Sequence, residues 1–185
     1  MTKILVLGGY GNFGKRICQA LSDAGFSVIV AGRNRERCLH LAQTLNAQYS
    51  IFDVETQLVE YLDRLKPKIV INTCGPFQNQ DYRVAKQCIE KGIHYIDIAD
   101  GREFVCGISQ LNLAAKEKNV LVVSAGSGDY IAGAGGTLVR LIGEGYTVIV
   151  VQFTNDEKNS VGLSPAETRL RNNREGDQAA RILGV

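Results

Sequence analysis

The stretch Leu5-Val-Leu-Gly-Gly-Tyr-Gly-Asn-Phe-Gly14 decides the fold of this chain. It places a Gly-x-Gly-x-x-Gly pattern, formed by Gly9, Gly11 and Gly14, directly after an apolar strand and directly before a helical pattern. In such a loop one glycine makes a tight turn, the next lets the backbone approach a pyrophosphate, and the third lets the helix pack close to the strand. The alternative is a glycine-rich turn that binds no ligand.

The residues on either side of the loop favour the dinucleotide interpretation. Residues 3–7 predict a strand, residues 15–24 a helix that ends at Gly25, and residues 27–31 a second strand. The N-terminus of that helix offers N–H groups and the positive end of its dipole to an anion. We therefore predict that a dinucleotide is bound by Gly9, Tyr10, Gly11, Asn12, Phe13 and Gly14.

Composition and charge exclude several classes of protein. The chain has 185 residues, 45% of them hydrophobic and 22% charged, which is ordinary for one globular α/β domain. A net charge of +2 without basic or acidic runs predicts no charged surface that would bind nucleic acid or an anionic membrane. No apolar stretch approaches the ~18 residues of a membrane span. The N-terminus enters a strand at once, so we expect no signal peptide and a cytoplasmic protein.

The cysteines and histidines argue against a disulfide framework and against a metal site. The two histidines, His40 and His94, are too few for a histidine-based metal centre. The cysteines are odd in number and never in Cys-x-x-Cys spacing, which indicates reduced thiols: Cys18, Cys38, Cys74, Cys88 and Cys106.

Strand and helix patterns alternate after the glycine loop, which predicts a doubly wound, mostly parallel sheet of the Rossmann type. We expect this NAD(P)-binding domain over residues 1–145, and a strand-helix appendage, or the start of a substrate and dimerisation domain, over 146–185. The expected helices are 35–45, 55–65, 81–91 and 102–119, and the later strands are 48–52, 68–72, 94–98, 120–124 and 146–153.

The end of the second strand predicts which dinucleotide is bound. A carboxylate there binds the ribose 2′-hydroxyl of NAD, whereas the guanidinium fork of an arginine suits the 2′-phosphate of NADP. This position holds Arg33, with Asn34, Arg35 and Arg37 nearby, and no carboxylate precedes Glu36. The residues favour NADP, with NAD possible; the alternative is a solvated basic helix start.

Two later strand ends add candidate cofactor residues. Asp53 follows the third strand and either faces the adenine or caps the next helix. The fourth strand ends where the strand order of this fold reverses and the cofactor crevice opens. There we expect an irregular backbone that lines the crevice, with an aromatic ring that can cover the cofactor: Cys74, Gly75, Pro76 and Phe77.

No residue qualifies from sequence alone as a catalytic acid or base. Cys74 lacks a histidine or lysine partner, so a small lining residue is favoured over a nucleophile. Asp97 and Asp100 either position a substrate amine or the nicotinamide ribose, or cap the next helix. Tyr82 and Lys86 match the Tyr-x-x-x-Lys pair of short-chain dehydrogenases, but they follow the fourth strand, which is too early for that family.

Several motifs in order resemble a known family over residues 2–125. They are Gly8-Gly-Tyr-Gly-Asn-Phe-Gly14, Ala31-Gly-Arg-Asn34, Asn72-Thr-Cys-Gly-Pro-Phe77, Tyr82 with Val84-Ala85 and Cys88, and His94-Tyr-Ile-Asp-Ile-Ala-Asp-Gly101. Together they resemble the NAD(P)-binding N-terminal domain of the saccharopine dehydrogenase-like family. The resemblance implies hydride transfer between NADP(H) and an amino-acid-derived small molecule, with a following domain that binds substrate and forms a possible homodimer.

The same resemblance implies roles for individual residues. Gly9, Gly11 and Gly14 would hold the pyrophosphate, Arg33 and Asn34 the adenosine phosphate side, and residues 72–77 would flank the nicotinamide. Two features depart from the family. The loop at 126–133 reads Gly126-Ser-Gly-Asp-Tyr-Ile-Ala-Gly133 in place of a proline-containing turn, and family members are usually about twice this length. A non-catalytic NAD(P) sensor, or a scaffold, is therefore the alternative to an oxidoreductase.

Overall fold

The computed structural model describes residues 2–78, 80–99 and 101–124, and residues 164, 166, 167 and 170 of the tail. The chain divides into two compact units, Met1–Ser124 and Ala125–Val185. The expected domain boundary at residue 145 and the strand expected over 146–153 lie outside the described residues. In the tail, the Ser164 N–H donates to Glu167 Oε2 at 2.9 Å and the Glu167 N–H to Ser164 Oγ at 3.3 Å. These reciprocal bonds form a capping box.

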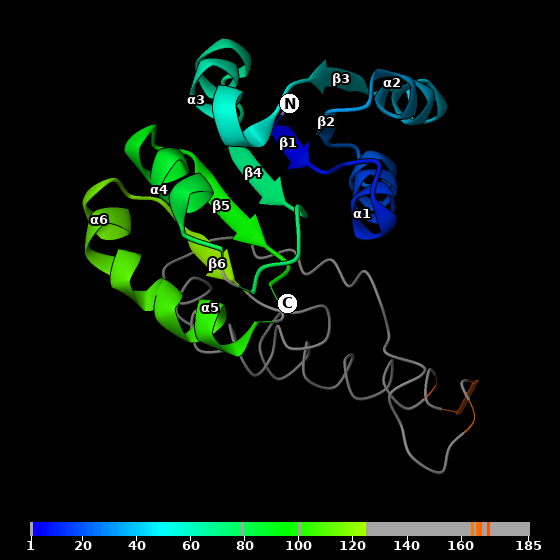
Figure 1. Ribbon diagram of the computed structural model, residues 1–185. Coiled ribbons are helices and arrows are strands. Elements are labelled where there is room, and N and C mark those ends of the chain that lie inside the picture. The colour runs from blue at the N-terminus through cyan, green and yellow to red at the C-terminus, as the bar shows by residue number, and fades with distance from the viewer. Residues whose placement is uncertain are drawn as a thin grey trace. The chain divides into compact units, whose positions relative to one another are not determined.

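Six parallel strands form one sheet in the first unit (Figure 1). Its order is β3-β2-β1-β4-β5-β6, so the direction of winding reverses between β1 and β4. This order is the doubly wound Rossmann topology, and it confirms the predicted fold class. The strands are β1 (Lys3–Leu7), β2 (Ser27–Gly32), β3 (Gln48–Ile51), β4 (Ile69–Asn72), β5 (His94–Asp97) and β6 (Val122–Ser124).

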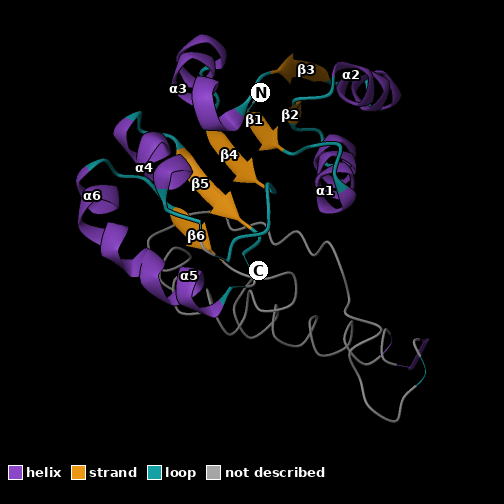
Figure 2. Cartoon of the chain, viewed as in Figure 1, coloured by secondary structure: helices purple, strands orange, loops and turns teal. Residues whose placement is uncertain are grey.

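Helices connect consecutive strands and cover both faces of the sheet (Figures 1 and 2). On one side lie α1 and α2, and on the other lie α3, α4 and the segment from α5 to α6. Among the described residues, no helix is both long enough and apolar enough to cross a bilayer. The helical elements are α1 (Asn12–Asp23), α2 (Arg35–Thr44), α3 (Val54–Leu65), α4 (Arg83–Glu90), α5 (Arg102–Gly107), the 3₁₀ turn η1 (Ile108–Leu111) and α6 (Asn112–Glu117).

The central strands are buried on both faces, as parallel strands between two helical layers must be. Leu5 and Leu7 of β1 belong to the core cluster that contains Leu58 and Leu62 of α3. Residues that alternate with them, such as Val6, are equally buried. Burying a leucine side chain contributes about 1.5–3 kcal/mol, so this core fixes the position of the strand ends that form the site.

One predicted helix is divided. The sequence predicts a single helix over 102–119, but α5 ends at Gly107 and a 3₁₀ turn precedes α6. The hydroxyl of Tyr82 lies against Gly107, so a side chain at this position would collide with it. Glycine therefore admits the close contact here, and it is also a poor residue for continuing a helix.

The five cysteines are free thiols, as the sequence predicts. Burial raises the pKa of Cys18 and of Cys88 to about 12, and that of Cys38 to about 11. Cys106 on α5 is exposed. Three of the thiols are therefore inert components of the core.

Candidate functional site

The glycine loop connects β1 to α1 at the point where the winding reverses. A Cβ at Gly14 would collide with the backbone of Gly8 and Gly9, so α1 can approach the sheet closely only with glycine there. A Cβ at Gly11 would meet one atom within 4 Å, the Gly8 carbonyl oxygen at 3.1 Å, and would otherwise project into open space. The loop therefore leaves room above Gly11 that any larger residue would fill.

The first turn of α1 presents N–H groups that no side chain caps. Gly11 is the N-cap residue and lacks a side chain, and no acidic residue occupies the first turn. The first bond within the helix runs from the Lys15 N–H to the Gly11 carbonyl at 3.0 Å. The N–H groups of Asn12, Phe13 and Gly14 precede it, so they are the donors that a helix start offers to an anion. These features fit a dinucleotide pyrophosphate.

Tyr10 of the glycine loop covers the end of β2. Its ring lies against Gly32, where a Cβ would collide with the ring. Its hydroxyl accepts a hydrogen bond from the Asn34 N–H at 3.1 Å. The guanidinium of Arg37 lies over the same ring, 4.8 Å from its centroid. The glycine loop and the β2–α2 turn therefore form one assembly, while Arg33 in that turn is exposed.

Asn34 and Asp53 both cap helices. The Asn34 Oδ1 accepts from the Arg37 N–H at 2.9 Å, and the Asp53 Oδ1 accepts from the Glu55 N–H at 2.9 Å. The capping alternative for Asp53 is thus present in the structure. Because that bond uses one carboxylate oxygen, it is compatible with the expected contact to adenine through the other.

The loop after β4 is tied to the glycine loop. Thr73 Oγ1 donates to the Leu7 carbonyl at 2.7 Å and to the Gly8 carbonyl of the glycine loop at 3.2 Å, and the Thr73 N–H donates to the Leu7 carbonyl at 3.0 Å. Buried Asn72 accepts the Cys74 N–H on its Oδ1 at 3.0 Å. Residues at the carboxyl ends of β1 and β4 therefore hold the start of residues 72–77, the segment predicted to flank the nicotinamide.

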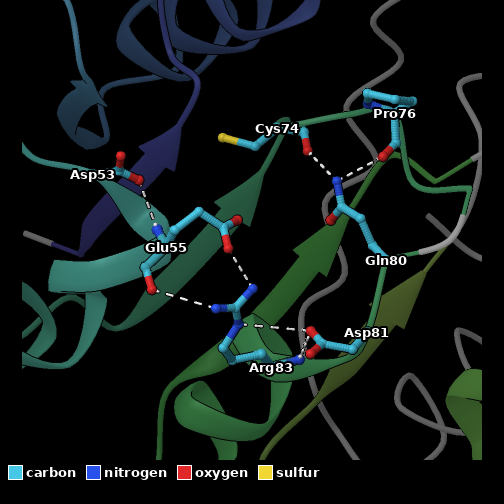
Figure 3. Close-up of polar contacts among 7 residues, drawn as sticks. All are labelled: Asp53, Glu55, Cys74, Pro76, Gln80, Asp81 and Arg83. Carbon is cyan, nitrogen blue, oxygen red and sulfur yellow. Dashed lines mark hydrogen bonds and ion pairs between the residues drawn. The ribbon is translucent and has the colours of Figure 1, made fainter.

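Gln80 holds the same segment from the other side (Figure 3). Its Nε2 donates to the Cys74 carbonyl at 2.8 Å and to the Pro76 carbonyl at 2.7 Å. The Gly75–Pro76 peptide bond between these carbonyls is cis. Sequence reasoning missed Gln80, because nothing in a single glutamine on a polar loop signals that it bridges two carbonyls.

Arg83 joins the starts of two helices beside this loop (Figure 3). It forms an ion pair with Glu55 at the start of α3 and lies 3.8 Å from Asp81 Oδ1. These side chains are largely exposed, so each pair contributes at most about 1 kcal/mol. The cluster therefore links the starts of α3 and α4 only weakly.

The structure gives different environments to Cys74 and Phe77. Burial raises the pKa of Cys74 to about 11, and the nearby Arg33 lowers it only in part. The thiol is therefore protonated at neutral pH, which agrees with a lining residue rather than a nucleophile. The Phe77 ring is only 3% exposed and packs on Phe104, with centroids 5.4 Å apart. The expected cover of the cofactor by this ring stays a prediction.

Two buried polar residues and one partly buried serine lie in register at the ends of β4, β5 and β6. Asn72 of β4 pairs with Asp97 of β5, which pairs with Ser124 of β6. Asn72 Nδ2 donates to the Tyr95 hydroxyl at 3.1 Å, and Ser124 Oγ donates to Asp97 Oδ1 at 2.7 Å. Burial raises the pKa of Asp97, and its Oδ2 has no hydrogen-bond partner in the described part of the chain.

Asp97 does not cap α5, whose N-cap is Gly101. Its Oδ1 accepts instead from the Ala99 N–H at 3.1 Å. The Tyr82 hydroxyl donates to the Phe104 carbonyl at 2.7 Å, which makes it a structural contact. Among residues 2–78, 80–99 and 101–124, no group of histidine, cysteine or carboxylate side chains could hold a metal ion. Asp100 lies outside the described residues.

The family described as "Saccharopine dehydrogenase NADP binding domain" matches residues 4–123. This match confirms the resemblance that the motifs indicate, and it confirms NADP as the cofactor that the family binds. No curated protein matches the sequence.

Solved structures share the fold at low identity. Apo saccharopine dehydrogenase (L-Glu forming) from Saccharomyces cerevisiae is 18% identical over 78% of this chain and 32% of its own, with a TM-score of 0.54. BdcA in complex with NADPH is 12% identical over 66% of this chain and 68% of its own, with a TM-score of 0.54. GenD2 from gentamicin A biosynthesis, in complex with NAD, is 20% identical over 76% of this chain and 38% of its own, with a TM-score of 0.51.

These likenesses show the fold alone, and this chain spans about a third of the length of the yeast enzyme. The family assignment depends instead on the match over 120 consecutive positions, 4–123 of 185, which cover all six described strands except the first residue of β1 and the last residue of β6. The chain therefore belongs to the family of saccharopine dehydrogenase NADP binding domains.

Proposed function

We propose that this chain is the cofactor-binding part of an oxidoreductase that transfers hydride between NADP(H) and an amino-acid-derived substrate. The observation that carries the proposal is the joining of three elements at the reversal point of the sheet. The glycine loop, the β2–α2 turn with Arg33 and the loop after β4 are connected there by hydrogen bonds of Tyr10 and Thr73. In doubly wound sheets this is where a dinucleotide lies.

Each element has a distinct task in the proposal. The N–H groups at the start of α1 would bind the pyrophosphate, and the room above Gly11 would let it approach. Arg33 would bind the 2′-phosphate, and Asp53 would accept from adenine. The Cys74–Phe77 segment, held by Asn72 and Gln80, would fix one side of the nicotinamide.

The bound cofactor would supply the hydride chemistry, and the protein would supply its position. Asn72 and Gln80 would restrict the conformations of the Cys74–Phe77 backbone before the cofactor binds. The segment that borders the nicotinamide would therefore already be in position for the reaction. Because the Cys74 thiol is protonated and the Phe77 ring is buried, this segment would contact the nicotinamide through its backbone. The amino-acid-derived substrate is supported by the family match, in which saccharopine dehydrogenases give the domain its description.

Separate calorimetric titrations with NADPH and NADH test the proposal. We expect tight binding of NADPH and weak binding of NADH. The variant Arg33→Ala should weaken NADPH binding by about tenfold or more, as expected for a charge-assisted hydrogen bond, and change NADH binding little. Binding of neither cofactor by the folded protein would contradict the proposal, and an equal loss for both in Arg33→Ala would remove the 2′-phosphate role.

A non-catalytic NADP(H) sensor is the second candidate. It is favoured because the Tyr82 hydroxyl, at the start of α4, is bonded to the Phe104 carbonyl, and because Asp97, at the end of β5, is buried. The Tyr82 hydroxyl is therefore already used within the protein, and Asp97 is removed from solvent. Screening the full chain for NADPH oxidation with keto acids and amino acids distinguishes the two. Turnover with any pair supports the enzyme, whereas tight binding without turnover across the screen supports the sensor.

A further inference from the structure

The stacking of Arg37 on Tyr10 gives the site a second specificity determinant. We propose that Arg37 is a second guanidinium for the 2′-phosphate of NADP, and that Tyr10 is the positioning residue that holds it there. The inference rests on the proposed function and deepens it, because the sequence predicts the phosphate contact at Arg33 and Asn34, with Arg37 only nearby, and predicts Tyr10 in the loop that binds the pyrophosphate.

Tyr10 is fixed by three contacts. Its ring lies against Gly32, its hydroxyl accepts from the Asn34 N–H at 3.1 Å, and one ring face carries the Arg37 guanidinium at 4.8 Å. Gly32 and Asn34 flank Arg33 in the chain. The stacking therefore places the Arg37 guanidinium beside the turn that bears Arg33.

The charge of Arg37 is available to a ligand. Within the described residues, no carboxylate forms an ion pair with Arg33 or Arg37, whereas Arg83 is paired with Glu55 and Asp81. A guanidinium that stacks on an aromatic face keeps its N–H donors at the edge of the plane. An exposed, unpaired and oriented guanidinium is suited to bidentate recognition of a phosphate.

Gly32 is the residue that allows the Tyr10 ring to lie against the end of β2. Any side chain at that position would collide with the Tyr10 ring, so the ring can take its place only over glycine. Its placement connects the glycine loop to the residues that distinguish NADP from NAD.

The first experiment compares Arg37→Ala with Arg35→Ala by calorimetric titration of NADPH and NADH. Both variants remove one positive charge from the first turn of α2, but Arg35 has no contact with Tyr10 among those the structure describes. We expect Arg37→Ala to weaken NADPH binding about tenfold, as for one charge-assisted contact, with NADH unchanged. Arg35→Ala should leave both affinities near those of the wild type.

The second experiment tests the positioning role of Tyr10. Tyr10→Leu removes the stacking face and Tyr10→Phe retains it. We expect Tyr10→Leu to reduce NADPH affinity to the same extent as Arg37→Ala, and the double variant to lose no more than either single one, because Tyr10 acts through Arg37. Tyr10→Phe should retain most of the preference for NADPH. Thermal unfolding of each variant serves as the control for folding.

Clear outcomes would overturn the inference. Equal loss of NADPH and NADH in Arg37→Ala would mean that Arg37 contacts a part shared by both, such as adenine. A full tenfold loss in Arg35→Ala would move the role to that residue, and additive losses in the double variant would separate Tyr10 from Arg37. If the wild type bound neither cofactor, the proposed function would fail, whereas a wild type that prefers NADPH with an unaffected Arg37→Ala would overturn this inference alone.

Discussion

Gly11 and Gly14 show how the same residue type serves two different purposes. At Gly14 the space that a side chain would need is filled by the backbone of Gly8 and Gly9. At Gly11, the N-cap residue of α1, that space is open apart from the Gly8 carbonyl oxygen. One glycine is therefore needed for packing of the protein itself, and the other for approach of a ligand.

We expect Gly11→Val to fold and to lose affinity for both NADPH and NADH. The valine side chain would occupy the position of the pyrophosphate, while its Cβ would meet only the Gly8 carbonyl oxygen. Gly14→Ala should instead destabilise the protein by about 1–3 kcal/mol, because an overpacked contact must relax. Cofactor titration and chemical denaturation of both variants measure the two effects. Retained binding by folded Gly11→Val would exclude the dinucleotide site.

The sequence predicts some residue roles and not others. The spacing of the glycines is local information, so it identifies Gly9, Gly11 and Gly14 directly. Tyr10 was predicted to bind cofactor, but its contacts to Gly32 and Asn34 depend on the approach of two loops. Phe77 was expected to cover the cofactor because it is aromatic and near the crevice; its burial against Phe104 depends on a helix that lies later in the chain.

Among the elements, the loop after β4 is held by side chains from three places. Thr73 bonds it to β1, Asn72 bonds it from within β4, and Gln80 bonds it from the segment before α4. A short segment with this many fixed points loses little further entropy when it binds a flat ligand. The arrangement is therefore preorganised.

We expect Gln80→Ala to loosen this loop without unfolding the domain. The variant removes two hydrogen bonds from an exposed side chain, so the domain should lose no more than about 1–2 kcal/mol in stability. Amide hydrogen exchange over residues 74–77 should accelerate, and NADPH affinity should fall by severalfold. Lys86→Ala, on exposed α4 surface, is the matched control and should change neither quantity. Unchanged exchange in Gln80→Ala would show that the other contacts suffice.

Element boundaries were predictable where local signals were strong. Strand β1 occupies the expected residues 3–7, because an apolar run and a glycine loop define both ends. The predicted helix over 102–119 was wrong in its middle, where α5, η1 and α6 follow one another. The cause is the contact between Gly107 and the Tyr82 hydroxyl, which joins residues 25 positions apart and leaves no periodic signal.

At the scale of the whole molecule, the strand order could be predicted because alternation of strands and helices permits few right-handed arrangements. The row formed by Asn72, Asp97 and Ser124 could not be predicted from the sequence, because it depends on the register of neighbouring strands. Register is set by packing of both sheet faces rather than by any local pattern. The sequence therefore predicts the architecture better than the polar network that the architecture brings together.

The stability of the first unit should decrease in mild acid because of His94. Its Nδ1 accepts the Leu121 N–H at 3.0 Å, and burial, assisted by Lys68, lowers the pKa of the ring. The neutral ring is favoured in the folded protein, whereas the unfolded chain takes up a proton near its ordinary pKa of about 6.5. Stability therefore falls as pH decreases through about 6.5.

Urea denaturation at about pH 7.5 and about pH 5.5 measures this dependence. We expect the free energy of unfolding to fall on acidification in the wild type, and to fall less in His94→Asn. Asparagine offers an oxygen to the Leu121 N–H and does not titrate in this range. The same decrease in both proteins would assign the acid sensitivity to other groups.

The distribution of thiols has a practical consequence. Three cysteines are inside the core, Cys74 has a raised pKa beside the candidate site, and Cys106 stands exposed on α5. A thiol-directed reagent used briefly at neutral pH would therefore attach first at Cys106, without mutagenesis of the natural sequence. A fluorophore or a surface tether placed there would provide a single reporter for following cofactor binding, one molecule at a time, on an otherwise unmodified chain.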